Sequence, residues 1–68
     1  MYKILNQVTS EIIDELSDYD EAVRYMQRLN GTFNKTRIAR NWINNQEREL
    51  YKDTNGHVAY GTYIIQSE

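Results

Sequence analysis

A chain of 68 residues holds one small domain with a single compact core. It has no cysteine, which excludes disulfides and thiolate metal sites, and its 8 basic and 10 acidic residues leave a formal net charge of −2. Apolar residues make up 40% of the chain, but no run of about 18 of them is present to span a membrane. The apolar stretch after Lys3 is too short for a signal peptide. We therefore expect a single domain over residues 1–68, cytoplasmic and without a membrane partner.

The N-terminal part predicts a β-hairpin. Residues 2–8 form a short, partly alternating apolar stretch typical of a strand. After a polar break, the β-branched pair Ile12-Ile13 favours a second strand over residues 12–16 that returns beside the first. A short helix over residues 10–16 is the alternative, because its apolar residues also fit one helical face. We prefer the hairpin, because Ser17-Asp18 then starts a new helix.

Residues 18–30 show the clearest pattern in the chain, that of an amphipathic helix. Ser17 or Asp18 can cap its first turn, and Asn30-Gly31 suits the left-handed conformation of a helix end. Its apolar residues recur at helical spacing and define a face that must be buried: Tyr19, Ala22, Val23, Met26 and Leu29.

Residues 36–46 fit either a helix or a strand. In a helix, Thr36 is the cap and Ile38 and Trp42 share a face. In a strand, one face carries Ile38, Arg40 and Trp42, and the other carries Arg37, Ala39, Asn41 and Ile43. Asn44-Asn45 marks a break after either element.

The C-terminal part predicts a second hairpin. Asn55-Gly56, the strongest short-range hairpin signal, lies between residues 49–52 and residues 57–65. Both faces of the second arm carry apolar groups, which indicates a strand that is central or covered on both sides. Gly61 in that arm indicates a bulge or the close approach of another backbone.

Together these elements predict an α+β fold. It is a small single domain in which an antiparallel sheet from the N-terminal and C-terminal hairpins packs on one central helix, residues 18–30.

Nothing in the sequence indicates catalysis. The single histidine, His57, adjoins a turn and has no second histidine or cysteine to complete a transition-metal site. The sequence has no nucleophile elbow and no phosphate-binding glycine loop. The acidic residues between 11 and 21 are typical of a solvated face and helix caps. We expect no enzyme activity, catalytic residue, metal or cofactor.

Residues 29–43 resemble the turn and recognition helix of helix-turn-helix DNA-binding proteins. In this resemblance Phe33 fills the apolar site, Asn34 is the cap and Ile38 is buried, while the C-terminal hairpin is a wing. The resemblance implies DNA contacts by Lys35, Thr36, Arg37 and Arg40. The turn is longer than in that family, and the chain is acidic overall. A winged helix-turn-helix DNA-binding regulator is therefore the alternative for fold and function.

Our first hypothesis is a small non-enzymatic protein–protein interaction module, a phage-type modulator or inhibitor of a larger protein. The order of a hairpin and then a helix over residues 2–30 looks like many small phage and prophage proteins. A domain of this size without disulfides often gains stability from a partner, so we expect an unidentified protein partner or a second copy in a homodimer. The interface candidates are the aromatic residues Tyr25, Trp42, Tyr60 and Tyr63.

Overall fold

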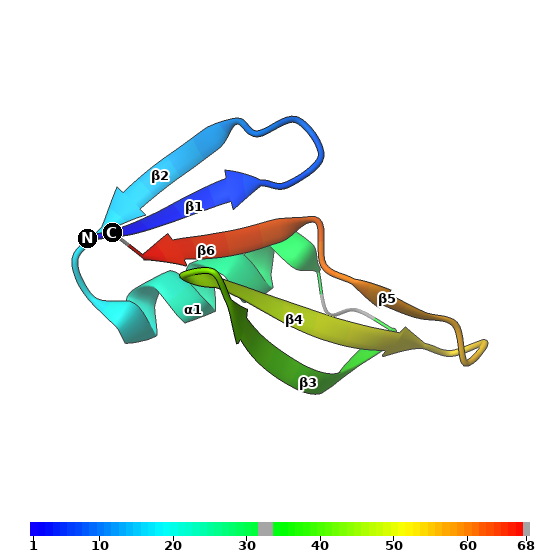
Figure 1. Ribbon diagram of the computed structural model, residues 1–68. Helices are drawn as coiled ribbons and strands as arrows, with labels where there is room; N and C mark the ends of the chain where they lie inside the picture. Colours follow the sequence, from blue (N-terminus) through cyan, green and yellow to red (C-terminus); the bar gives the residue numbers. More distant parts are fainter. Residues whose placement is uncertain (32–33, 68) are drawn as a thin grey trace.

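One antiparallel sheet with a helix packed on one face forms the fold in the computed structural model, which describes residues 1–31 and 34–67 (Figure 1). The elements are β1 (Tyr2–Asn6), β2 (Ile12–Leu16), α1 (Tyr19–Asn30), β3 (Lys35–Ile43), β4 (Gln46–Asp53), β5 (Val58–Tyr60) and β6 (Tyr63–Ser67). The described strands follow the order β2-β1-β6-β4-β3, and β5 also pairs with β4. The predicted α+β fold is confirmed.

The N-terminal hairpin is confirmed, and the helical alternative for residues 10–16 is wrong. β1 and β2 pair antiparallel, with Tyr2 opposite Leu16. The connecting turn is closed by the Asn6 side chain, whose Oδ1 accepts hydrogen bonds from the backbone N–H groups of Val8 at 2.9 Å and Thr9 at 3.2 Å. An asparagine that bonds to the amides two and three residues ahead favours a turn over a continuing strand.

The helix is confirmed with the predicted ends. Asp18 caps α1, because its Oδ1 accepts a hydrogen bond from the Asp20 N–H at 2.9 Å. Gly31 ends it with φ of 67° and donates its N–H to carbonyls of the last turn. Of the predicted apolar face, Ala22, Val23 and Met26 are buried on the sheet, where they form the core with Ile4 and Ile65, while Tyr19 and Leu29 are partly buried against this core.

Residues 35–43 form a strand, so the winged helix-turn-helix alternative is wrong for this segment. β3 pairs with β4 through the two-residue turn Asn44-Asn45, whose φ angles are 52° and 63°. Positive φ at both turn residues matches the right-handed twist of the flanking strands, and asparagine tolerates it. The apolar position assigned to Phe33 lies outside the described residues.

A β-bulge at Ile38 changes which side chains of β3 share a face. Arg37 lies opposite Tyr51 and Ala39 opposite Leu50, so Ile38 has no partner in the register. The extra residue moves Arg37 onto the same face as Arg40, where simple alternation predicted opposite faces. The bulge therefore brings both arginines to the side of the sheet that faces α1, whereas simple alternation was wrong for Arg37.

The C-terminal hairpin is confirmed at Asn55-Gly56, where the Asp53 Oδ1 accepts hydrogen bonds from two turn N–H groups. Its second arm is not one strand over residues 57–65, because β5 ends at Tyr60 and β6 begins at Tyr63. β5 stays with β4, while β6 lies between β1 and β4. The predicted central position holds for β6 alone, since the side chains of β5 are exposed.

α1 has 12 residues, and no helix within residues 1–31 and 34–67 is long and apolar enough to cross a membrane.

Candidate functional site

Two glutamates on β4, Glu47 and Glu49, are fully buried on the side of the sheet that faces α1. They alternate with outward residues, so both point the same way. An isolated buried carboxylate is very costly, and a folded chain must supply each one with cations or hydrogen-bond donors. The two glutamates and the side chains that contact them form what we call the polar cluster: Glu47, Glu49, Tyr19, Gln27, Arg37, Arg40 and Tyr51.

Glu49 collects four donors from three elements. Its Oε2 accepts hydrogen bonds from Arg37 Nη1 at 2.9 Å, Gln27 Nε2 at 3.2 Å and Arg40 Nε at 3.4 Å. Its Oε1 accepts one from the Tyr51 hydroxyl at 3.0 Å. Both carboxylate oxygens are therefore satisfied, and α1, β3 and β4 are tied together at one residue.

Glu47 is held less completely. Its Oε2 accepts a hydrogen bond from the Tyr19 hydroxyl, and its Oε1 lies 3.3 Å from Arg40 Nε without hydrogen-bond geometry among the described residues. Burial raises the pKa of Tyr19, and the hydrogen bond to Glu47 raises it further, because loss of the proton would place a second anion there.

The arginines of the polar cluster are anchored but remain open to solvent. The Arg37 and Arg40 side chains are 43% and 36% exposed, whereas both glutamates are fully buried. Burial lowers the pKa of Arg40, but the charges of Glu47 and Glu49 outweigh it and raise the pKa above its ordinary value. Each arginine side chain is thus fixed by a buried carboxylate while part of it stays accessible to solvent.

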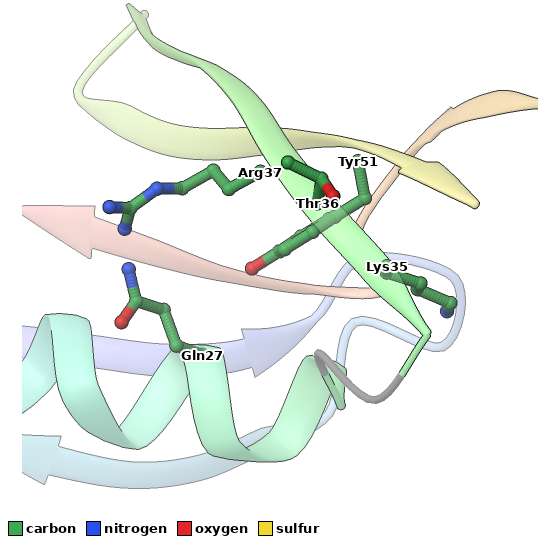
Figure 2. Close-up of a pocket in the computed structure, with 5 residues that line it drawn as sticks. All are labelled: Gln27, Lys35, Thr36, Arg37 and Tyr51. Carbon is green, nitrogen blue, oxygen red and sulfur yellow. The ribbon is translucent and has the colours of Figure 1, made fainter. Parts of the chain in front are cut away.

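Two hollows flank Arg37 along β3. Figure 2 shows the first, of about 400 Å³, where Gln27 from α1 points toward Arg37 and the Tyr51 hydroxyl while Lys35 points away along the strand. It is lined by Gln27, Lys35, Thr36, Arg37 and Tyr51. The second, of about 380 Å³, is lined by residues 37–40. Both are open depressions in the surface beside β3.

β3 is also a free edge of the sheet. In the described part of the chain its one strand neighbour is β4, so the backbone groups on its outer side have no strand partner. Trp42 and Ile43 are 47% and 54% exposed, and Ile38 is exposed at the bulge. Trp42 stacks on Tyr19 with 6.1 Å between ring centroids, which holds the indole beside the edge.

The four aromatic residues predicted as an interface do not form one surface. Tyr25 and Tyr63 are half-buried against the core, which gives them a packing role. Trp42 and Tyr60 are exposed, but the strand register places them on opposite faces of the sheet, since Trp42 lies opposite Glu47 and Tyr60 opposite Leu50. Trp42 stacks on Tyr19 of the polar cluster, and Tyr60 lines a hollow together with Tyr51.

The residues proposed for DNA contact all lie on β3. Lys35, Arg37 and Arg40 share the face toward α1, and Thr36 lies on the other face. They therefore do come together, but on a strand, and two of the three cations are paired with buried glutamates.

Sequence reasoning missed Glu47 and Glu49. One sequence signal could have indicated them. The two glutamates are two residues apart, so they share a face of a strand, and the segment before them carries the arginines that could pair with them. Once Asn44-Asn45 is a two-residue turn, Trp42 falls opposite Glu47 and Arg40 opposite Glu49. The match with Arg37 depends on the bulge, which the sequence pattern does not reveal.

A comparison of the chain with protein-family models, with curated proteins and with solved structures finds no match.

Proposed function

We propose that this protein is a small non-enzymatic interaction module that binds a protein partner along the free edge of β3, as a modulator or inhibitor of a larger protein. The observation that carries the proposal is the length and composition of that edge. β3 has nine residues, no strand neighbour on its outer side among the described residues, and three exposed large apolar side chains.

A free edge binds an extended segment by adding it to the sheet. The unpaired N–H and C=O groups of the edge supply main-chain hydrogen bonds, and the flanking side chains supply selectivity. Trp42 is suited to be the anchor, because a tryptophan held in place by a neighbouring ring loses little conformational freedom on binding. The other edge, β2, has five residues and carries Asp14 and Glu15, which makes it the poorer docking strand.

DNA binding has less support. The charges of Arg37 and Arg40 are offset by Glu47 and Glu49 within the fold, which weakens the attraction for phosphates. The segment to which the helix-turn-helix resemblance assigned a recognition helix forms the strand β3. The contacts predicted for the four β3 residues stay a hypothesis without a specific observation in their favour.

The test is capture of a partner by the immobilised full chain and measurement of the affinity of that partner for variants. Replacing Trp42 with alanine should weaken binding by about 30-fold, as expected for an anchor worth about 2 kcal/mol. Tyr60→Ala is the matched control, since Tyr60 is equally exposed but lies on the other face of the sheet. Circular dichroism should show that both variants are folded.

Two results would contradict the proposal. One is the absence of any saturable protein partner, and the other is a partner whose affinity is the same for the wild type and Trp42→Ala. Sedimentation of the isolated protein tells whether the partner is a second copy.

A further inference from the structure

We infer that Asn55 is a site of spontaneous deamidation in the folded protein, whereas Asn30 is protected by the hydrogen bonds that fasten α1 to β6. Deamidation is a covalent modification that converts an asparagine amide into a carboxylate and so changes the charge of the protein. Asparagine is a thermolabile residue, and the reaction is fastest where glycine follows, because glycine has no side chain to obstruct it. The sequence contains two such pairs, Asn30-Gly31 and Asn55-Gly56.

The reaction takes place between an asparagine side chain and the backbone nitrogen of the next residue. That nitrogen loses its proton and forms a bond to Cγ of the asparagine, and the C–N bond of the side-chain amide breaks to release ammonia. Water then opens the resulting succinimide ring at either carbonyl, which gives aspartate or isoaspartate. One water is consumed and one ammonia released for each carboxylate formed. The side-chain amide must therefore be free to turn, and the backbone N–H must leave its hydrogen bond.

Both reacting groups of the Asn30-Gly31 pair are held in hydrogen bonds. Asn30 Oδ1 accepts the Tyr63 N–H at 2.7 Å, and Asn30 Nδ2 donates to the Tyr63 carbonyl at 3.1 Å. The Gly31 N–H donates to two carbonyls of the last helical turn, those of Gln27 at 3.1 Å and Arg28 at 3.3 Å. Reaction at Asn30 therefore requires the end of α1 to separate from β6, which is a local unfolding of the packed part of the domain.

The Asn55-Gly56 pair is held at one of its two reacting groups. Asn55 is exposed, and its side chain makes no hydrogen bond to any residue that the structure describes. The Gly56 N–H donates to the Asp53 carbonyl at 3.1 Å, in a turn that projects from the body of the molecule (Figure 1). Opening one hydrogen bond in an exposed turn costs less than separating α1 from β6. The fold therefore protects Asn30 more strongly than Asn55.

The product of the reaction disturbs β5 and leaves the rest of the sheet in place. Isoaspartate carries the main chain through its side chain, which lengthens the turn by one methylene group. The turn depends on Asp53, whose Oδ1 accepts the N–H groups of Asn55 and His57, both at 2.9 Å. A carboxylate at position 55 is repelled by that of Asp53. Among the described strands β5 pairs with β4 alone, while Asn30 fastens β6 separately. Deamidation thus loosens β5 without unfolding the domain.

The experiment is incubation of the full-length protein at mildly alkaline pH, in buffer and in concentrated urea, with peptide mapping by mass spectrometry at intervals. In buffer, Asn55 should convert at least about tenfold faster than Asn30, because only Asn30 needs a larger local unfolding. In urea the two rates should agree within about threefold, because a flexible glycine follows each asparagine. Asn55→Gln is the matched control, since it keeps an amide at this exposed position but must close a larger ring, and it should abolish the rapid conversion.

Gly61→Ala tests the protection of Asn30. A Cβ at position 61 would lie 2.5 Å from Asn30 Nδ2. The substitution displaces this amide from Tyr63, so it should raise the rate at Asn30 in the folded protein by about fivefold or more and leave the rate at Asn55 unchanged. In the converted wild type, faster hydrogen exchange of the Asp53 N–H, which donates to the His57 carbonyl at 3.0 Å, measures the loosening of β5.

Three results would overturn the inference. The first is conversion of Asn30 as fast as that of Asn55 in the folded wild type. The second is conversion of Asn55 in urea but not in buffer, because the hydrogen bond of Gly56 would then be sufficient protection. The third is an unchanged rate at Asn30 in folded Gly61→Ala, because the bonds to Tyr63 would then not be what protects it. The first two results come from the wild type and do not depend on the folding of any variant.

Discussion

At the scale of single residues, Gly61 lies where the last arm of the chain divides into β5 and β6. A Cβ at this position would lie 2.5 Å from the amide nitrogen of Asn30. That amide is held in place, because Asn30 Oδ1 accepts the N–H of Tyr63 at 2.7 Å and its Nδ2 donates to the Tyr63 carbonyl at 3.1 Å. Asn30 thus fastens the end of α1 to the start of β6, and only glycine leaves room for it. The sequence predicted that another backbone segment approaches Gly61. In the structure the group that approaches it is a side chain.

Gly61→Ala is therefore expected to destabilise the protein by about 1–3 kcal/mol, because the methyl group must displace the Asn30 amide from its two hydrogen bonds. Urea unfolding measures the change. Thr62→Ala, at the neighbouring exposed position, should change the free energy of unfolding by less than about 0.5 kcal/mol. Equal stability of Gly61→Ala and the wild type would contradict the close packing of Asn30.

At the scale of elements, short turns determine which strands pair. Asn44-Asn45 returns the chain directly, so β3 and β4 form the longest ladder in the sheet, and β4 then carries β5 at one end and β6 at the other. The turn is also tied to the C-terminal strand, since the Asn45 carbonyl accepts the N–H of Ser67 at 2.8 Å. The conformation of one turn thus positions the polar cluster.

Asn45 is suited to a direct test because its φ is 63°. Asn45→Gly should leave the free energy of unfolding unchanged or raise it slightly, since glycine adopts this conformation without strain. Asn45→Val should lower it by about 1–2 kcal/mol, because a β-branched residue is strained at positive φ. Thermal or urea unfolding of the two variants checks the difference, and a valine variant as stable as the glycine variant would contradict the turn.

At the scale of the whole molecule, the uneven charge of the sequence is partly compensated by tertiary contacts. Residues 22–46 contain five basic residues and no acidic one, but Arg37 and Arg40 from this stretch meet Glu47 and Glu49 beneath β3. Burying two charge pairs is weak evidence for stability in itself. In this protein the two charge pairs fix the positions of the Arg37 and Arg40 side chains.

The polar cluster also predicts how stability depends on pH. Burial, and after it the hydrogen bond to Glu49, raise the pKa of Tyr51 to about 12. In the unfolded chain a tyrosine titrates near 10, so the unfolded state loses this proton first as the pH rises. The contribution of Tyr51 to stability is thus complete below about pH 10 and is lost between about pH 10 and 12.

Urea unfolding at several pH values from 8 to 12 tests this dependence. Tyr51→Phe should be less stable than the wild type by about 1 kcal/mol at pH 8, because Glu49 loses a donor. Its further loss of stability between pH 10 and 12 should be smaller than that of the wild type. Tyr60→Phe, at a half-exposed tyrosine, should retain the wild-type dependence. The same slope in Tyr51→Phe and the wild type would contradict the assignment.

The local part of the fold followed from the sequence by itself. The caps and the apolar face of residues 18–30, the hairpin at Asn55-Gly56 and the preference for a hairpin before Ser17 all depend on interactions between residues close in the chain. These interactions are the same in any tertiary context, so their residue pattern is sufficient to predict them.

The tertiary structure alone decided the strand at residues 35–43 and the candidate site. Both periods fitted that segment, and pairing with β4 outweighed its weak local preference. Glu47 and Glu49 became a site only because the Ile38 bulge, the turn at Asn44-Asn45 and the side chains of α1 bring cations and hydroxyls to one place. A bulge shifts every later side chain by one position, and its location depends on the fit of the two strands, which is a property of the assembled sheet.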